Sequence, residues 1–248
     1  MINKIKKNLR IIIIIPARLK SVRLRKKLLK KIDKIPMIIR VAKNAEKLKI
    51  GRVIVGTDSK EILKLCTENE IECILTNKNH KSGTDRVHEV YTMIDENYDL
   101  IINLQGDLPL FKRDLFKEMI NLFNDKSVDI GSAVCDLDDI EIEDENIVKA
   151  EVILNNFNTG TALDFCRKID KNANFYHHIG VYVYKPLTLE KFVQLKQTKN
   201  ELERSLEQMR ALDNNYKIKL VKVLYNPPSV DTEKDLQKIR LIFKKNNF

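Results

Sequence analysis

Five consecutive isoleucines at positions 11–15 constrain the fold more than any other feature of this sequence. An uninterrupted β-branched run is typical of a strand that is buried on both faces, as in a parallel sheet covered by helices. Although the residues before it are basic, the run is too short for a signal peptide and ends at Pro16. We find no membrane-spanning stretch, so we expect no membrane insertion and a cytoplasmic location.

Strand-like and helix-like segments alternate through the first half of the chain. We expect strands at 11–15, 52–56, 71–75 and 100–103. Helices are expected from Pro36 to about Leu48, from the N-cap Ser59 to Leu65, at 84–94 and at 112–123. This alternation predicts an α/β fold with a mostly parallel sheet, in which ligands bind beyond the carboxyl ends of the strands.

The second half of the chain is richer in strands. We expect strands at 130–134, 148–154, 162–167, 179–184 and 218–223, and helices at 203–212 and 233–243. No linker rich in Pro, Gly or Ser separates the halves, so we expect one domain over residues 1–248.

The chain is basic, with a formal net charge of +10. Its Lys and Arg residues are scattered and are not interleaved with aromatic residues, which favours a generally basic surface or an anionic substrate over nucleic-acid binding. The cysteines form no C-x-x-C pair and fit no zinc pattern, so we expect reduced thiols.

The loop after the first expected strand concentrates basic residues. They are Arg18, Lys20, Arg23, Arg25, Lys26 and Lys27. Such a loop at the carboxyl end of a strand suits a triphosphate, since Lys and Arg offset several negative charges at close range. A solvated basic loop is an equally good interpretation from spacing alone.

Two further motifs lie at the ends of expected strands. The segment N-H-K-S-G-T-D-R at 79–86 precedes a helix and suits a base or a phosphate, although an ordinary helix cap explains it better on chemistry alone. The segment N-L-Q-G-D-L-P at 103–109 sets Asp107 at a strand exit, where a carboxylate suits the Mg²⁺ ion of a bound triphosphate.

Taken together, the ordered motifs resemble the 3-deoxy-manno-octulosonate (Kdo) cytidylyltransferase family over nearly the whole chain. The motifs are I-P-A-R at 15–18, S-V-R-L at 21–24 with Lys27, P-M-I at 36–38, the two segments above, N-I-V-K at 146–149, A-L-D-F-C-R at 162–167, H-I-G-V-Y at 178–182, L-E-Q-M-R-A-L at 206–212 and V-D-T at 230–232. The resemblance implies a three-layer, Rossmann-like nucleotide-diphospho-sugar transferase fold with a smaller mixed β lobe. It implies a nucleotide-binding part at about 11–135 and a sugar-binding and dimerisation lobe at about 145–212.

The resemblance also implies roles for particular residues. The catalytic residues would be Arg18, Lys27 and Asp107. The nucleotide contacts would be Arg18, Arg23, Lys27, Thr57, Asp58, Ser82, Gly83 and Gln105. The sugar contacts would be Lys149, Arg167, His178, Glu207 and Gln208. The Mg²⁺ ligands would be Asp107 and Asp231, and Asp231 is also a good N-cap for the last helix.

The activity implied is transfer of CMP from CTP to Kdo, with release of pyrophosphate, by a homodimer that serves lipopolysaccharide biosynthesis. Alternatives are a cytidylyltransferase for another acidic sugar (amino-Kdo or a nonulosonate), a non-catalytic homologue, and a basic nucleic-acid binder. The chain departs from the family pattern at Leu28, Leu108, Asp164 and Cys166.

The clearest departure lies in the first loop, where Arg25 and Lys26 replace Pro and Gly. If the loop needs a positive φ at position 26, the lysine costs roughly 1–2 kcal/mol there.

Overall fold

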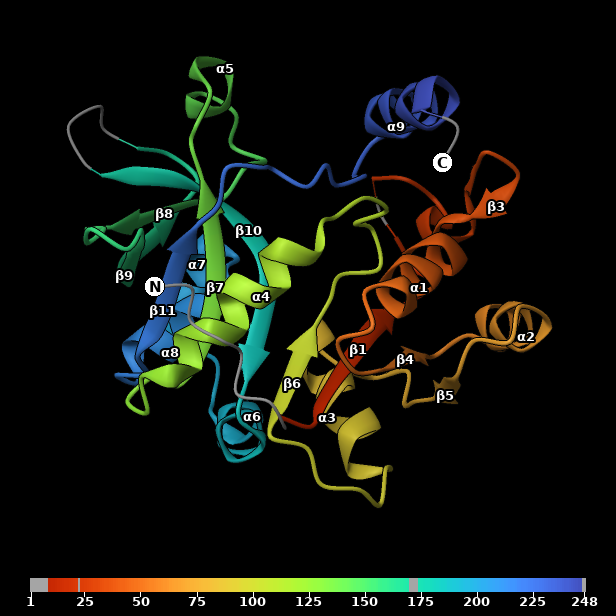
Figure 1. Ribbon diagram of the computed structural model, residues 1–248, viewed down its shortest axis with the longest axis horizontal. Helices are drawn as coiled ribbons and strands as arrows, with labels where there is room; N and C mark the ends of the chain where they lie inside the picture. Colours follow the sequence, from red (N-terminus) through yellow and green to blue (C-terminus); the bar gives the residue numbers. More distant parts are fainter. Residues whose placement is uncertain (1–8, 22, 170–173, 247–248) are drawn as a thin grey trace. The chain divides into compact units, whose positions relative to one another are not determined.

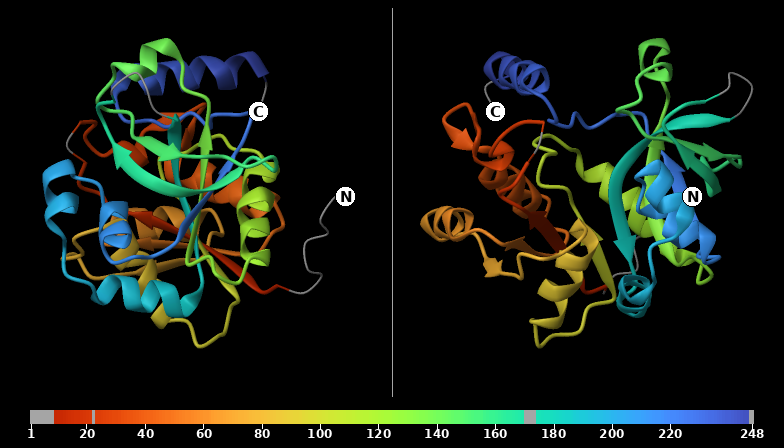
Figure 2. Two further views of the ribbon diagram at one scale, coloured as in Figure 1. Left: turned by 90° about the vertical axis from the view of Figure 1, so that its left-hand side faces the viewer. Right: turned by 180° about the vertical axis from the view of Figure 1, so that it is seen from behind.

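A computed structural model describes residues 9–21, 23–169 and 174–246 of the chain. The basic segment 1–8 and Val22 of the first loop therefore lie outside the described residues. The chain divides into two compact units. We call Leu9–Lys112 with Pro227–Phe248 the first unit, and Arg113–Asn226 the second unit (Figures 1 and 2). The expectation of a single domain stays a prediction.

The first unit contains a parallel sheet in the order β5-β4-β1-β6. Its strands are β1 (Ile11–Ala17), β4 (Arg52–Thr57), β5 (Cys73–Leu75) and β6 (Leu100–Asn103). The isoleucine run lies in β1 between β4 and β6, with Ile14 opposite Ile54 in the register of one neighbour and opposite Asn103 in the other. All five isoleucines are buried, as the apolar run predicts.

Three helices of the first unit pack against these strands (Figure 1). They are α1 (Met37–Lys47), α2 (Lys60–Glu68) and α3 (Gly83–Thr92), whereas α9 (Glu233–Asn246) contacts β2 (Lys31–Ile32). Ser59 caps α2, as expected, and its Oγ accepts a hydrogen bond from the Ile62 N–H at 3.3 Å. At α1 the expected boundary shifts by one residue, since Pro36 is the N-cap.

The second unit has a mixed sheet in which the strand pairing closes on itself. Its order is β10-β7-β11-β9-β8, and β8 also pairs with β10. The strands are β7 (Ile130–Cys135), β8 (Lys149–Val152), β9 (Thr159–Cys166), β10 (Phe175–Tyr184) and β11 (Ile218–Lys222). The pairs are antiparallel except β7 with β11. The expected α/β class is therefore confirmed.

The remaining elements of the second unit are helical. They are α4 (Arg113–Asn121), the 3₁₀ turn η2 (Leu122–Asn124), α5 (Asp139–Ile142), α6 (Pro186–Gln194), α7 (Lys199–Arg204) and α8 (Gln208–Asp213). The single helix expected at 203–212 is wrong, because α7 ends at Arg204 and the next residue, Ser205, adopts a left-handed φ of 53°. The short helix α6 begins at Pro186 and was not predicted.

Left-handed backbone conformations fall on residues other than glycine. Among the described residues, eight non-glycine residues have positive φ, and none of the glycines does. They are Lys26, Asp33, Lys34, Lys49, Glu70, Asn158, Ser205 and Asn215. The positive φ suspected at position 26 is confirmed, with φ 54° at Lys26.

Asp33 and Lys34 form the two-residue connection between β2 (Lys31–Ile32) and β3 (Ile35–Pro36). Both have positive φ, as a type I′ hairpin turn requires, yet such turns favour glycine at the second position.

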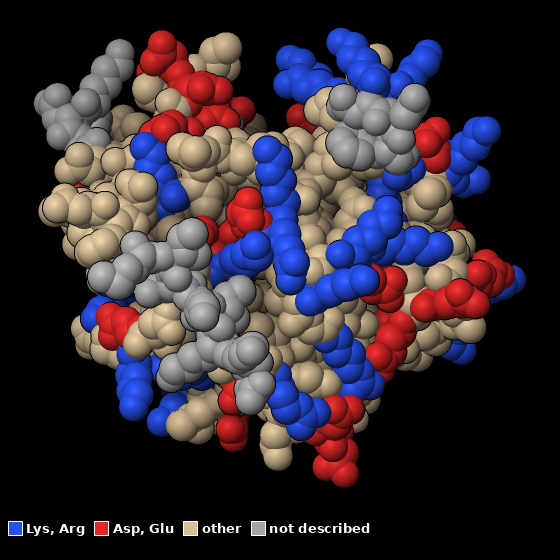
Figure 3. Space-filling model, viewed as in Figure 1, with Lys and Arg blue, Asp and Glu red and all other residues tan. Residues whose placement is uncertain are grey.

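The surface is basic but mixed in sign. In the view of Figure 3, Lys and Arg side chains are spread widely and interleaved with Asp and Glu. Among the described residues, no helix has both the length and the apolar character needed to cross a bilayer.

We predict that Lys34→Gly stabilises the protein by about 1 kcal/mol, because glycine removes the left-handed strain of an exposed turn residue. Urea unfolding monitored by circular dichroism measures the change. Lys31→Gly is the matched control, since Lys31 is an exposed lysine on the adjoining strand, where glycine lowers stability by about 0.5–1 kcal/mol. Equal effects of the two substitutions would contradict the assignment of strain to Lys34.

Candidate active site

A basic cavity of about 380 Å³ lies in the first unit at the carboxyl ends of β1 and β6. Its lining includes predicted site residues from four separate segments of the chain. They are Arg18, Arg23, Lys27, Ser82, Gly83, Gln105, Asp107 and Asp231. The rule that ligands bind beyond the carboxyl ends of parallel strands therefore holds for this unit.

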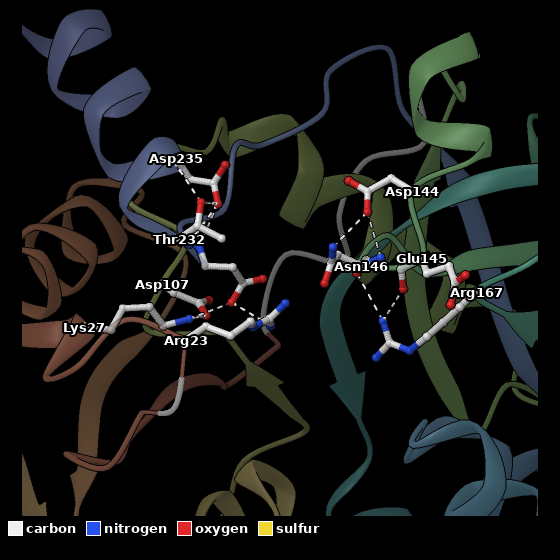
Figure 4. Close-up of polar contacts among 10 residues, drawn as sticks. Arg23, Lys27, Asp107, Asp144, Glu145, Asn146, Arg167, Thr232 and Asp235 are labelled. Atoms are coloured by element: carbon white, nitrogen blue, oxygen red, sulfur yellow. Dashed lines mark hydrogen bonds and ion pairs between the residues drawn. The ribbon is translucent and has the colours of Figure 1, made fainter.

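Two carboxylates in this cavity converge on one ammonium group (Figure 4). Nζ of Lys27 donates to Asp107 Oδ2 at 2.5 Å and to Asp231 Oδ1 at 2.9 Å. Burial lowers the pKa of Lys27, but the two carboxylates raise it more, and the net shift is upward. Arg23 adds a second ion pair to Asp231 at 3.0 Å. The predicted metal ligands are thus close together and carry compensating cations.

The backbone also brings Asp107 and Asp231 together. The N–H of Val230 donates to the carbonyl of Asp107 at 3.0 Å. Thr232, and not Asp231, caps α9, because Thr232 Oγ1 accepts from the Asp235 N–H and Asp235 Oδ2 accepts from the Thr232 N–H. The expectation that Asp231 caps the last helix is therefore wrong, and its carboxylate faces the cations instead.

The start of α3 supplies another wall of the cavity. Ser82 forms a capping box with Asp85, so the helix-cap interpretation of this motif is confirmed, while its nucleotide contact stays a prediction. His80 also lines the cavity and contacts the carboxylate of Glu89. Burial raises the pKa of Glu89, but hydrogen bonds from His80 and the Asn77 N–H lower it more. Sequence reasoning did not select His80, although it belongs to the quoted motif.

Thr57 and Asp58 do not line this cavity. Thr57 is fully buried, and its Oγ1 accepts from the Ser59 N–H at 3.2 Å. Both oxygens of Asp58 are engaged: Oδ1 accepts from the Leu19 N–H at 3.2 Å and Oδ2 from Arg86 at 3.1 Å. Asp58 therefore connects the first loop to α3, and Thr57 supports the turn that leads into α2.

Arg25 and Lys26, which depart from the family pattern in the first loop, also lie outside the cavity lining. The Lys26 ammonium pairs with Glu61 of α2 at 2.9 Å, and Lys26 forms the N-cap of the 3₁₀ turn η1 (Lys27–Leu29). Lys20 and Ser21 of the same loop do line the cavity and were not among the predicted contacts.

In the second unit, Arg167 and Lys149 hold three successive carbonyl groups of one loop. Arg167 NH1 donates to the carbonyls of Glu145 and Asn146 at 3.0 and 3.1 Å (Figure 4). Lys149 is fully buried, and its Nζ donates to the carbonyls of Asp144 and Arg167, each at 2.7 Å. Burial lowers the pKa of Lys149. Lys149 therefore fixes the backbone of Arg167, and its predicted sugar contact stays a prediction.

His178 lies buried on β10, with its ring 4.9 Å from Phe165 and 5.5 Å from Tyr182 between centroids. The Ser132 hydroxyl has one proton, which it donates to a backbone carbonyl, Val181 O at 2.8 Å. Its Oγ therefore accepts from His178 Nε2–H at 3.0 Å, and Nδ1 is left as an acceptor. Burial lowers the pKa of His178 to about 3, with a smaller effect of His177.

Glu207 and Gln208 lie at the start of α8, beside a buried ion pair. Arg210 donates to both oxygens of Glu201, at 2.8 and 2.5 Å, and lies 3.8 Å from Glu207. Burial raises the pKa of Tyr182, and the charge of Glu207 raises it further, so Glu207 lies near the Tyr182–His178 pair. Tyr182 was not among the predicted contacts, although its motif was recognised.

Comparison with known proteins defines the class of this chain. The family model described as "Cytidylyltransferase" matches residues 12–218. The 3-deoxy-manno-octulosonate cytidylyltransferase of Bartonella henselae is 40% identical over 93% of this chain and 97% of its own length. The enzyme of that name from Rickettsia prowazekii is 39% identical over 97% of this chain and 98% of its own length.

A solved structure agrees with these relatives. CMP:2-keto-3-deoxy-manno-octonic acid synthetase complexed with CTP superposes with a TM-score of 0.86 at 30% identity, covering 95% of this chain and 99% of the other. The chain belongs to the 3-deoxy-manno-octulosonate cytidylyltransferase family. The family and fold predicted from the sequence motifs are confirmed.

Because His178 is buried and neutral, we predict that the free energy of unfolding depends on pH. Its folded pKa of about 3 lies below the unfolded value, so the unfolded chain binds more protons and stability falls as pH drops through 6.5 toward 3. Between pH 7.5 and 5.5, we expect the wild type to lose about 1.4 kcal/mol more than His178→Gln. Urea unfolding at both pH values measures this difference. Equal losses would mean that His178 is not held neutral.

Proposed function

We propose that this protein transfers CMP from CTP to Kdo, giving CMP-Kdo and pyrophosphate. Family membership supports the reaction class, and the CTP complex of the structural relative supports the nucleotide. The names of the curated relatives support the sugar. The expected place of the product is lipopolysaccharide biosynthesis.

The observation that carries the proposal is the pair of carboxylates inside a basic cavity. Asp107 and Asp231 share one ammonium group, and Arg18, Arg23 and Lys20 also line the cavity. A triphosphate brings several negative charges, which these cations offset at close range. The carboxylates of Asp107 and Asp231 would repel the triphosphate, and a divalent cation bound between them and the phosphates would offset this repulsion.

The donor set fits a magnesium ion. Asp107 and Asp231 are oxygen donors that already converge on a cation, the Lys27 ammonium. Within residues 9–21, 23–169 and 174–246, no three His, Cys, Asp or Glu residues form a metal cluster. Such a pair of carboxylates suits Mg²⁺, which takes its other oxygens from phosphates and water. We propose that Asp107 and Asp231 hold this ion.

The chemistry is a direct displacement at phosphorus. The anomeric oxygen of Kdo forms a bond to the α-phosphorus of CTP, the bond to the bridging oxygen breaks, and the hydroxyl proton passes to solvent. Arg18, Arg23 and Lys27 stabilise the leaving pyrophosphate through their charges. When bound, Mg²⁺ would offset charge on the α-phosphate and make the sugar hydroxyl more acidic.

We assign the sugar contacts to residues of the second unit. Arg167 uses NH1 for backbone carbonyls, and no contact of its Nε or NH2 is found within the described part of the chain. That edge of the guanidinium suits the sugar carboxylate, because it offers two parallel donors. The Nδ1 acceptor of His178 and the side chains of Glu207 and Gln208 suit sugar hydroxyls.

Two of the departures from the family pattern are accounted for without another sugar. Leu108 is buried and does not line the cavity, and Asp164 is paired with Arg204 at 2.5 Å. Pyrophosphate release with CTP and Mg²⁺ tests the proposal across Kdo, amino-Kdo and a nonulosonate. Fastest turnover with a sugar other than Kdo would overturn the substrate assignment, and no turnover with any sugar would favour a non-catalytic homologue.

We predict that Asp107→Asn and Asp231→Asn each lower kcat for pyrophosphate release by about a hundredfold or more, since an amide does not supply the charge that holds the metal. Asp95→Asn is the matched control, because Asp95 is an exposed carboxylate of the same unit outside the cavity, and it should retain full activity. Near-normal turnover of either cavity variant would remove that residue from the metal site.

We predict that Arg167→Lys raises KM for Kdo about tenfold and changes KM for CTP less than about twofold, because lysine keeps the charge but loses the planar fork. Steady-state kinetics with each substrate varied in turn measures the split. Lys168→Arg serves as the control, since the neighbouring Lys168 is exposed and pairs with Glu145. A parallel rise of both KM values would place Arg167 outside the sugar contacts.

We also propose that the protein is a homodimer. The segment of β8 and β9 exposes large apolar side chains, with Ile153 67%, Phe157 84% and Leu163 52% exposed. Side chains of this kind gathered on one hairpin are typical of a surface that another protein covers. Sedimentation equilibrium of the full chain tests the proposal, and a monomer at micromolar concentration would contradict it.

A further inference from the structure

Lys27 occupies the position between the two carboxylates. Its side chain comes from η1 and is only 13% exposed, whereas Asp107 and Asp231 are 25% and 34% exposed. Nζ is within hydrogen-bond distance of both carboxylates at once. The ammonium is thus more buried than the groups that it neutralises, and it lies on their facing sides.

An ammonium in this position competes with a divalent ion. A metal bound through both carboxylates needs oxygens at about 2.0–2.1 Å, which is closer than the hydrogen-bonded Nζ. The ion and the ammonium would also repel each other at short range, because both are cations in a partly buried site. Lys27 and a metal bound through Asp107 Oδ2 and Asp231 Oδ1 therefore exclude each other.

The Lys27 ammonium can leave the two carboxylates when another anion is present to pair with it. Lys27 ends in a compact point charge on a long, flexible stem, and it lines the same cavity as Arg18 and Arg23. Phosphate oxygens in that cavity would give its ammonium a new partner and would at the same time supply ligands to a metal. One event, the arrival of the triphosphate, would thus remove the lysine and complete the metal site.

We propose that Lys27 excludes the metal from the nucleotide-free protein, so that the divalent ion enters together with the nucleotide and does not bind first. This inference rests on the proposed function, since it takes Asp107 and Asp231 as metal ligands and CTP as the source of phosphates. It assigns Lys27 a role in the free protein in addition to its role beside the leaving pyrophosphate.

Mn²⁺ binding to the nucleotide-free full chain tests the inference without any turnover. Electron paramagnetic resonance counts free Mn²⁺ in titrations of the wild type, Lys27→Met and Lys27→Gln. We expect both variants to bind one Mn²⁺ about tenfold or more tightly than the wild type, because the competing charge is gone. Two variants of different polarity, each checked by thermal unfolding, guard against a loss of fold in one of them.

Arg23→Gln is the matched control. The guanidinium of Arg23 pairs with Asp231 at 3.0 Å, and its side chain is 51% exposed. Removing this cation should raise Mn²⁺ affinity by less than about threefold, since exposed charges are screened. Adding Asp107→Asn to Lys27→Met should return the affinity to the wild-type level.

Two results would overturn the inference. One is equal Mn²⁺ affinity of the wild type and both Lys27 variants. The other is micromolar Mn²⁺ binding by the nucleotide-free wild type. Either result leaves pyrophosphate release by the wild type with CTP and Kdo untouched. Conversely, a wild type without turnover whose Lys27 variants gain Mn²⁺ would remove the proposed reaction and keep the metal exclusion.

Discussion

The first unit depends on the burial of β1. A strand without a polar side chain is stable only between two other strands and beneath helices, and β4 and β6 supply these neighbours. Because all three strands are parallel, their carboxyl ends meet at one edge of the sheet. This geometry brings the basic loop after β1 close to Asp107 after β6, and Lys27 of that loop then pairs directly with Asp107.

Much of this arrangement could be predicted from local patterns. The alternation of strands and helices predicted the order of the main elements of the first unit, and β6 matches to the residue. Other bounds differ, since α2 runs on to Glu68, and the β2–β3 hairpin was not predicted. The pairing of Asp107 with Asp231 could not follow from alternation, because Asp231 lies in the segment that returns to the first unit after the second unit is complete. The family motif alone connected these two residues, and the Lys27 contact between them had no signal in the sequence.

The differences between the predicted and the observed features have physical causes. The helical pattern at 203–212 continues without Pro or Gly, so nothing marked the left-handed Ser205 that separates α7 from α8. The ion pair of Glu201 with Arg210 bridges the two helices and stabilises that break. Thr57 and Asp58 were chosen for their position after a strand, but their side chains satisfy the backbone of the neighbouring loop and the guanidinium of Arg86.

The discontinuous first unit has a consequence for synthesis on the ribosome. Residues 9–112 emerge first, but the segment 227–248 that carries Asp231 and α9 emerges only after the whole second unit. Chains grow at about 5–20 residues per second, and domains fold as their residues become available. The growing chain therefore presents Lys27 and Asp107 without Asp231 for the time that the second unit takes to be made. The two carboxylates of the cavity therefore meet only after the whole second unit has been synthesised.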